Sequence, residues 1–338
     1  MPQESFGHHS GALDTTLGTG RTVMGQTTHE ASRGRVKAAR AALGPIGVSV
    51  PTTGMETVPM PQQIEGIRRL EKAGYRAAWA REGVGGHDAL VEIATLLGAT
   101  EQLVLGSAVA NMWARPAVTL HAAAATLGEA FPGRFVLGLG AGMAYQAEAL
   151  GLRYARPYSL MRDYLRAMTT PVPGLPTAEQ TYARIIAANG PKMVELAASA
   201  ADGAHPGLIP VEYTASVRAT LGPDKLLVVA LTVVALADRR AARDAAGQFV
   251  VGALGFPGSP YGANLARLGY TSDEIAAGAD RVVDAVMAYG RPDDIAARAR
   301  AHLDAGADHV LVNCVLPGYE TGIQQLEGLA PALTEITG

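Results

Sequence analysis

The sequence predicts an α/β protein in which strands and helices alternate to form a (β/α)8 TIM barrel. Short runs rich in β-branched residues recur along the chain, and longer stretches with apolar residues at helical spacing lie between them. The length of 338 residues allows two small domains or one large α/β domain, and the latter is enough for one barrel. Aromatic residues make up only 5% of the chain, so the core must consist mainly of Ala, Val, Leu and Ile. A doubly wound open sheet is the alternative fold, and it usually has fewer strands.

The elements are expected in a regular order. Residues 1–32 are rich in Gly, Thr, Ser and His without an apolar period, which predicts a disordered tail before a single domain at 33–338. A short basic helix at Arg33–Leu43 leads into the first strand. The eight predicted strands are Ile46–Val50, Ala77–Ala80, Leu103–Val109, Arg134–Leu139, Arg184–Ala188, Gly203–Gly207, Leu226–Leu236 and His309–Val315. The predicted helices include Pro61–Ala73, Asp88–Thr100, Ala117–Ala130, Ser159–Met168, Lys192–Ala201, Val211–Thr220 and Pro292–Ala305.

Two long connections interrupt this pattern. Residues 143–158 and 255–280 are punctuated by Gly and Pro, and they follow the fourth and the seventh predicted strands. Connections of that length in a compact domain are usually functional lids or insertions. Because barrel enzymes carry their chemistry at the C-terminal ends of the strands, the search for a site narrows to the segments that follow them.

Composition excludes several classes of function. The net charge of −3 indicates no nucleic-acid or anionic-membrane partner. A single cysteine, Cys314, excludes an internal disulfide framework and a cysteine-based zinc cluster, so no metal site is expected. His8 and His9 are interpreted as solvated tail residues. No run reaches about 18 apolar residues and no secretory signal is recognisable, so we expect a cytoplasmic protein.

Motifs of other mechanisms are missing from the sequence: it has no GxSxG elbow, no HExxH, no Walker loop and no paired CxxC. A glycine run, Gly138–Gly142, follows a strand, but Met143 stands where a dinucleotide fingerprint needs its third glycine. Two interpretations remain open. Gly140 and Gly142 either let the loop bend sharply or let the backbone approach a flat ring or a phosphate.

A second segment, Ala187–Lys192, runs from a strand end into a helix N-terminus. Free backbone N–H groups and the helix dipole favour an anion there. Ala188 and Gly190 permit close approach, Pro191 occupies the first helical position, and Lys192 adds positive charge. Gly207, after the next strand, is expected on the opposite wall. An ordinary β–α turn is the alternative.

Polar residues also follow the second and third strands. Asn111 can hydrogen-bond a ring carbonyl or amide, whereas Trp113 suits either packing or substrate contact. Glu82 is a candidate acid or base, with an ion pair to Arg81 or Arg115 as the alternative. His87 and His205 are the two histidines nearest to strand C-terminal ends. His87, Trp113, Arg115 and Met143 are therefore expected to line a substrate pocket.

Together these segments resemble the bacterial luciferase-like superfamily, and more narrowly its actinobacterial enzymes that use the deazaflavin coenzyme F420. The resemblance covers about residues 34–338. Its most specific pieces are LGSAVANMWARP at 105–116, GRFVLGLG at 133–140, GPKMVELA at 190–197, ADGAHP at 201–206 and AHLDAGADHV at 301–310.

The resemblance implies a ring lying across the strand C-termini. It also implies a non-prolyl cis peptide in a bulge at Ala108–Val109, a phosphate at Gly190–Lys192, and a homodimer. One departure concerns the acid/base: many deazaflavin relatives carry Asp-His after the second strand, and this chain has Glu82-Gly83. Another is Met143, which replaces a Glu of some relatives.

The resulting hypothesis is an F420-dependent oxidoreductase that transfers a hydride between C5 of the deazaflavin and a small organic substrate. Glu82 and His205 are its candidate catalytic residues. The alternatives are an FMN-dependent luciferase-like monooxygenase, which uses reduced flavin and O2, and a flavin-binding barrel without turnover.

Overall fold

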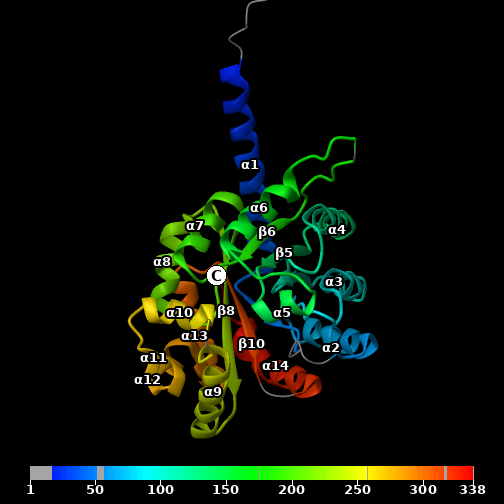
Figure 1. Ribbon diagram of the computed structural model, residues 1–338. Coiled ribbons are helices and arrows are strands. Elements are labelled where there is room, and N and C mark those ends of the chain that lie inside the picture. The colour runs from blue at the N-terminus through cyan, green and yellow to red at the C-terminus, as the bar shows by residue number, and fades with distance from the viewer. Residues whose placement is uncertain (1–16, 52–56, 175, 257, 316–317, 338) are drawn as a thin grey trace, which may run out of the picture.

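Parallel strands pair in chain order around a closed barrel, as the computed structural model of residues 17–51, 57–174, 176–256, 258–315 and 318–337 describes it (Figure 1). The last strand pairs with both the first and the eighth of the ten strands, which closes the ring. The predicted (β/α)8 fold is therefore confirmed. The eight strands of the ring are β1 (Ile46–Ser49), β2 (Ala77–Ala80), β3 (Val104–Ser107), β5 (Phe135–Gly140), β6 (Ala183–Ala187), β7 (Gly203–His205), β8 (Leu226–Ala235) and β10 (His309–Cys314).

Two short strands were not predicted. β4 (Ala110–Asn111) pairs with the end of β5, and β9 (Met287–Gly290) pairs with the last four residues of β8. β8 has 10 residues and so extends past its neighbour β7, which has 3. β7 therefore does not reach the last part of β8, and β9 pairs with the edge that is left there.

The barrel is surrounded by helices close to the predicted ranges. Their starts follow local rules: Asp88 Oδ1 accepts hydrogen bonds from Leu90 N and Val91 N, and Pro191 occupies the first turn of its helix. The surrounding helices are α2 (Met60–Lys72), α3 (Ala89–Gly98), α4 (Ala117–Ala130), α6 (Pro157–Thr169), α7 (Pro191–Ala200), α8 (Val211–Leu221), α13 (Pro292–Asp304) and α14 (Tyr319–Thr334).

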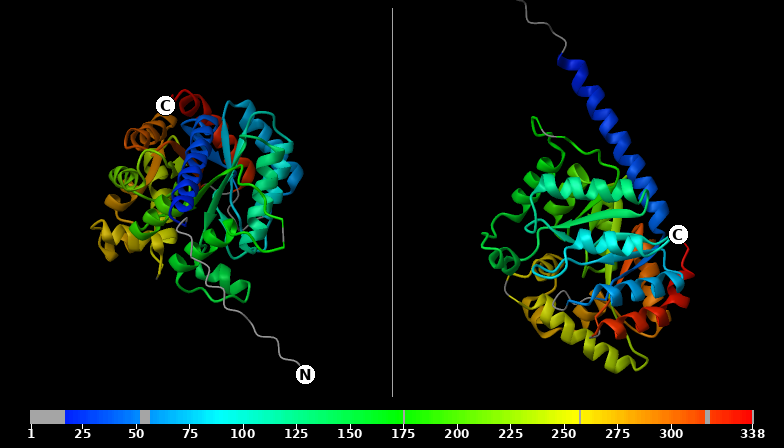
Figure 2. Two further views of the ribbon diagram at one scale, coloured as in Figure 1. Left: turned by 90° about the horizontal axis from the view of Figure 1, so that it is seen from above. Right: turned by 90° about the vertical axis from the view of Figure 1, so that its right-hand side faces the viewer.

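The first helix differs from the prediction. α1 spans Leu17–Leu43, so the predicted helix at Arg33–Leu43 is its C-terminal part, and residues 17–32 are helical rather than tail. Residues 1–16 of the predicted tail lie outside the described residues. Val36, Ala39 and Leu43 are buried against the N-terminal ends of the strands. Because a helix that is anchored at one end propagates at little cost, α1 continues outward from this contact (Figure 2).

The two predicted insertions contain short helices. α5 (Ala144–Ala149) lies in the first. The connection after β8 is longer than expected, because it also holds α9 (Arg239–Leu254) and α12 (Asp280–Val286) besides α10 (Pro260–Arg267) and α11 (Ser272–Ala277). These elements share an apolar cluster of their own with β8 and β9, which makes the connection a packed subassembly. Its buried members include Leu208, Val234, Val250, Leu265 and Val283.

Candidate active site at the barrel mouth

Alternation along the strands determines which side chains face the lumen of the barrel. On β2, Ala77 and Trp79 belong to the inner cluster, whereas Ala78 and Ala80 pack outward against the helices. The same alternation on other strands places small residues in the last inward layer before the C-terminal end, which we call the mouth. This mouth layer consists of Ala108, Gly140, Ala187, Gly207 and Ala230. A layer of such small side chains suits a flat ring placed over the lumen.

Aromatic side chains form the next layer down. The Trp79 indole N–H donates to His309 Nε2 at 3.1 Å, and His309 Nδ1 donates to the Gly44 carbonyl at 2.7 Å. His205 stacks on Trp79, with the ring centroids 6.0 Å apart and the planes 4° from parallel. Gly106 is required here, because a Cβ at this position would collide with the Trp79 ring.

His205 is a neutral imidazole in this layer. Burial lowers its pKa to about 4, and the nearby Arg81 contributes in the same direction. Its Nδ1 donates to the Val228 carbonyl at 3.0 Å, so Nε2 carries no proton at neutral pH. His205 can therefore accept a proton or a hydrogen bond there, but it cannot act as an acid at neutral pH.

Glu82 points away from the lumen. It is buried in the outer layer, where its carboxylate pairs with both terminal nitrogens of Arg115. Glu82 Oε2 also accepts from the backbone N of Asn111 at 2.5 Å, and Oε1 accepts from the backbone N of Ala89 at 3.4 Å. These contacts match the ion-pair alternative with Arg115 and connect β4 to the start of α3.

The bulge after β3 lies beside the mouth. The peptide bond Ala108–Val109 is cis, at the position that the family resemblance implies. Ala108 N donates to the Ala80 carbonyl at 2.7 Å. A Cβ on Gly140 would collide with Val109, and one on Gly138 would collide with the Ser107 carbonyl. The glycines therefore make room for the bulge, an explanation that the sequence alone did not offer.

The predicted phosphate turn is open. Apart from Gly190 and its two chain neighbours, no described residue has an atom within 4 Å of the position that a Cβ on Gly190 would take, and the φ of −88° suits any residue. Pro191 and Lys192 are exposed in the first turn of α7, and Ala188 is buried beneath them. Asn189 Oδ1 accepts from Gly207 N at 2.9 Å, which connects the turn to the residues that follow β7.

Most other predicted side chains are engaged in local contacts. Asn111 Oδ1 accepts from Trp113 N at 3.0 Å, and the Trp113 indole donates to the Ala141 carbonyl at 2.7 Å. Gly142 has a φ of +59°, which the turn beside Asn111 requires. The predicted pocket residues Arg115 and His87 are held by Glu82 and Gln63, respectively. Met143 is half-buried before α5.

Sequence reasoning considered Arg81 only as a partner of Glu82, but the structure places it at the mouth. It follows Trp79 by two residues and so faces the lumen. Its Nη2 donates to Asn313 Oδ1 on β10 at 3.2 Å. The alternation of β2 was a signal in the sequence that could have identified it.

Comparison with known proteins agrees with this architecture. The sequence model of a family described as luciferase-like monooxygenase matches residues 45–309. The chain belongs to this family. The chain is also similar in sequence to 5,10-methylenetetrahydromethanopterin reductase from Methanolobus tindarius. The two are 25% identical over 317 residues, which are 81% of this chain and 97% of the reductase.

Solved luciferase-like structures share the fold. The coenzyme F420 dependent tetrahydromethanopterin reductase from Methanopyrus kandleri superimposes with a TM-score of 0.69 and 17% identity, over 86% of this chain and 100% of the reductase. A riboflavin lyase solved with modified FMN gives a TM-score of 0.63 and 14% identity, over 86% of this chain and 91% of the lyase. The fold is therefore common to proteins that differ in their flavin.

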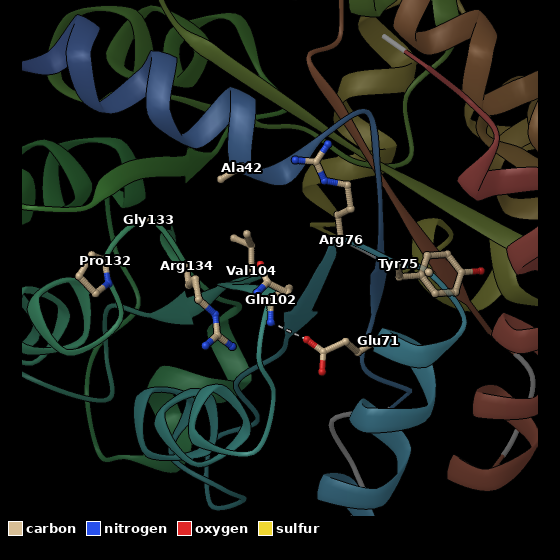
Figure 3. A pocket seen from close by; sticks show the side chains of 10 residues that line it. Ala42, Glu71, Tyr75, Arg76, Gln102, Val104, Pro132, Gly133 and Arg134 are labelled. Carbon is tan, nitrogen blue, oxygen red and sulfur yellow. Dashed lines mark hydrogen bonds between the residues drawn. The ribbon is translucent and has the colours of Figure 1, made fainter.

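A separate pocket lies at the other end of the barrel. It has a volume of about 480 Å³ and lies beside the residues that precede β2 and β3 (Figure 3). Its polar groups already serve the fold: Glu71 accepts from the backbone N–H groups of residues 101–103, and Arg134 donates to the carbonyls of Leu97, Thr100 and Leu103. Because (β/α)8 barrel enzymes carry their chemistry at the C-terminal ends of the strands, which is the opposite end, this pocket is not the candidate site.

Two features are absent from the residues that the structure describes. None of their helices is long and apolar enough to cross a membrane. They also contain no group of three or more His, Cys, Asp or Glu residues arranged to hold a metal ion.

Proposed function

We propose that this protein is an F420-dependent oxidoreductase that transfers a hydride between C5 of the deazaflavin and a small organic substrate. The observation that carries the proposal is the similarity over nearly the whole length of a methylenetetrahydromethanopterin reductase, together with a shared fold with a tetrahydromethanopterin reductase that is named as coenzyme F420 dependent. Membership of the luciferase-like family supports an oxidoreductase.

The residues at the mouth fit such a cofactor. The small Ala and Gly residues of the mouth layer leave room for a flat ring across from Arg81 and Asn313. The open turn at Gly190 leaves the N-terminus of α7, with its positive dipole end, free for a phosphate, and Lys192 adds a cation. When bound, F420 supplies the carbon that gives or takes the hydride.

The chain's own residues have defined tasks in this proposal. Gly190 and Lys192 bind the phosphate, and Ala108 and Val109 contact one face of the ring. Glu82 acts as a positioning residue, because its carboxylate is occupied by Arg115 and by the backbone of Asn111. His205, which is neutral, supplies an acceptor below the ring rather than a proton.

The decisive experiment titrates the purified protein with F420 and with FMN under the same conditions. Quenching of cofactor fluorescence reports the two dissociation constants. We expect F420 to bind at least ten-fold more tightly. Tighter binding of FMN would reject the proposal and favour the FMN-dependent monooxygenase, which the description of the family as luciferase-like monooxygenase makes the second candidate.

The phosphate turn provides a variant for the same assay. Gly190→Val introduces a side chain into open space at a permissive φ, so folding should be unaffected while access to the phosphate is lost. We expect F420 affinity to fall more than ten-fold. Lys192→Ala should reduce it less, and mostly at low salt. Gly98→Val, at another open position, is the matched control. Unchanged affinity in both Gly190→Val and Lys192→Ala would exclude this turn from the site.

A further inference from the structure

Arg81 occupies the lumen side of the mouth next to the bulge. Its two backbone neighbours bracket the cis peptide, because Ala108 N donates to the Ala80 carbonyl and Glu82 N donates to the Val109 carbonyl at 3.4 Å. Ala80 and Glu82, the residues on either side of Arg81, are therefore hydrogen-bonded to the bulge that follows β3. Its guanidinium lies across from the small residues of the mouth layer.

The charge of this guanidinium is not balanced within the described part of the chain. No ion pair there includes Arg81, and the neighbouring carboxylate, Glu82, is turned outward to Arg115. Burial lowers the pKa of Arg81, and the groups that oppose this are the phenols of Tyr261 on α10 and Tyr145 on α5. An arginine nevertheless stays protonated in proteins, so a positive charge remains at the mouth.

Asn313 orients the side chain. One N–H of Nη2 donates to its Oδ1, and no other hydrogen bond from the guanidinium is formed within the described residues. The remaining donors belong to a rigid planar fork that matches a carboxylate or a similar delocalised anion. A half-buried cation without a counter-charge is costly unless a ligand supplies one.

We propose that Arg81, oriented by Asn313, is an anion-binding residue of the active site, separate from the phosphate turn at Gly190, and binds a planar delocalised oxyanion. This inference rests on the proposed function for the identity of the mouth as the active site. The oxyanion has two possible sources: a carboxylate of the substrate, or the pyrimidine end of the reduced deazaflavin. The substrate class that fits the first source is a small organic acid.

The first arm of the test needs no cofactor. Binding of sodium benzoate is measured by calorimetry at constant ionic strength for the wild type, Arg81→Met and Arg81→Lys. We expect Arg81→Met to weaken binding at least ten-fold, and Arg81→Lys to retain part of it because it keeps the charge but loses the fork. Arg76→Met is the matched control, because Arg76 is exposed at the opposite end of the same strand.

The second arm measures the affinity for oxidised and for reduced F420 without oxygen. If the ring supplies the oxyanion, Arg81→Met should lose at least ten-fold more affinity for the reduced form than for the oxidised form. Thermal unfolding of each variant separates a folding defect from a lost contact. The milder Arg81→Lys, which keeps the charge, serves the same purpose.

The outcomes are distinct. Loss of benzoate binding assigns the substrate, and selective loss of reduced F420 assigns the ring. The inference is wrong if Arg81→Met changes neither the benzoate affinity nor the difference in affinity between reduced and oxidised F420. It is also wrong if the wild type binds no benzoate and the variant loses equal affinity for both redox forms. In both cases, F420 binding by the wild type still upholds the proposed function. If the wild type binds neither F420 nor FMN, the proposed function fails and the benzoate arm alone decides on Arg81.

Discussion

Glu92 of α3 is buried without compensation, so its replacement should stabilise the protein in a pH-dependent way. Its side chain is only 5% exposed, and its Oε1 has no hydrogen-bond partner within the described residues. Burial, with a smaller contribution from the Glu82 carboxylate, raises its pKa from 4.5 to about 7. The folded protein therefore holds a proton that the unfolded chain releases near pH 4.5.

The sign and the size of the change in stability follow from the difference between the pKa values of Glu92 in the folded and the unfolded protein. Between pH 4.5 and 7 the folded state binds more protons, so stability falls as the pH rises through that window and is then constant. The difference between pKa values of 4.5 and about 7 corresponds to about 3 kcal/mol in the free energy of unfolding. Glu92→Gln removes the titration, so the variant should match the wild type near pH 4.5 and exceed it by up to about 3 kcal/mol at pH 8.

Urea unfolding followed by circular dichroism at pH 5, 6, 7 and 8 measures the effect. Glu129→Gln makes the same change of charge at an exposed position and serves as the control. A stability difference that does not grow between pH 5 and pH 7 would refute the reasoning, and so would a destabilised variant at pH 8.

Four further predictions follow from the packing. Glu82→Gln should lower stability by about 1–3 kcal/mol with less than a ten-fold loss of turnover; a 10²–10⁴-fold loss at unchanged stability would restore the acid/base role. Gly138→Ala should cost roughly 1–3 kcal/mol or more in denaturant unfolding, because its Cβ meets the Ser107 carbonyl, and a neutral result would contradict that contact. Removing residues 1–31 should shift the melting temperature by about 2 °C at most, whereas Val36→Asp should lower stability by about 3 kcal/mol, because Val36 packs against the N-terminal ends of the strands. Equal effects would contradict the assignment of this contact as the anchor of α1. We also propose a homodimer that covers Val91 on α3 and Val118 on α4, which are 66% and 43% exposed, so Val91→Asp should lower the mass measured by light scattering, and a monomeric wild type would argue against it.

The barrel could be predicted because parallel strands that are buried on both faces leave a plain signal, such as Leu226–Ala235 or His309–Cys314. β9 was not predicted because Met287 follows the last residue of α12 directly, without a turn residue to mark the change from helix to strand. The start of α1 at Leu17 was not predicted because the apolar contact that anchors the helix lies at its C-terminal end.

The site could be predicted less well. The segments that surround the mouth were identified, but the direction of each side chain was not. Glu82 and Arg81 are adjacent, so alternation sends one outward and the other into the lumen, and the more familiar catalytic residue was the one that points outward. The need for Gly138 and Gly140 depends on a bulge in another strand, which no local pattern records.

The position of α1 has a practical consequence for attaching the protein to a solid support. This helix of 27 residues, about 40 Å long, leaves the barrel from the end opposite to the mouth (Figure 2). A tether fused ahead of α1 would hold the barrel with its mouth turned toward the solution, and the helix would act as a spacer. Small molecules would then reach immobilised protein as readily as free protein, which makes an N-terminal anchor the preferred geometry for a sensor chip.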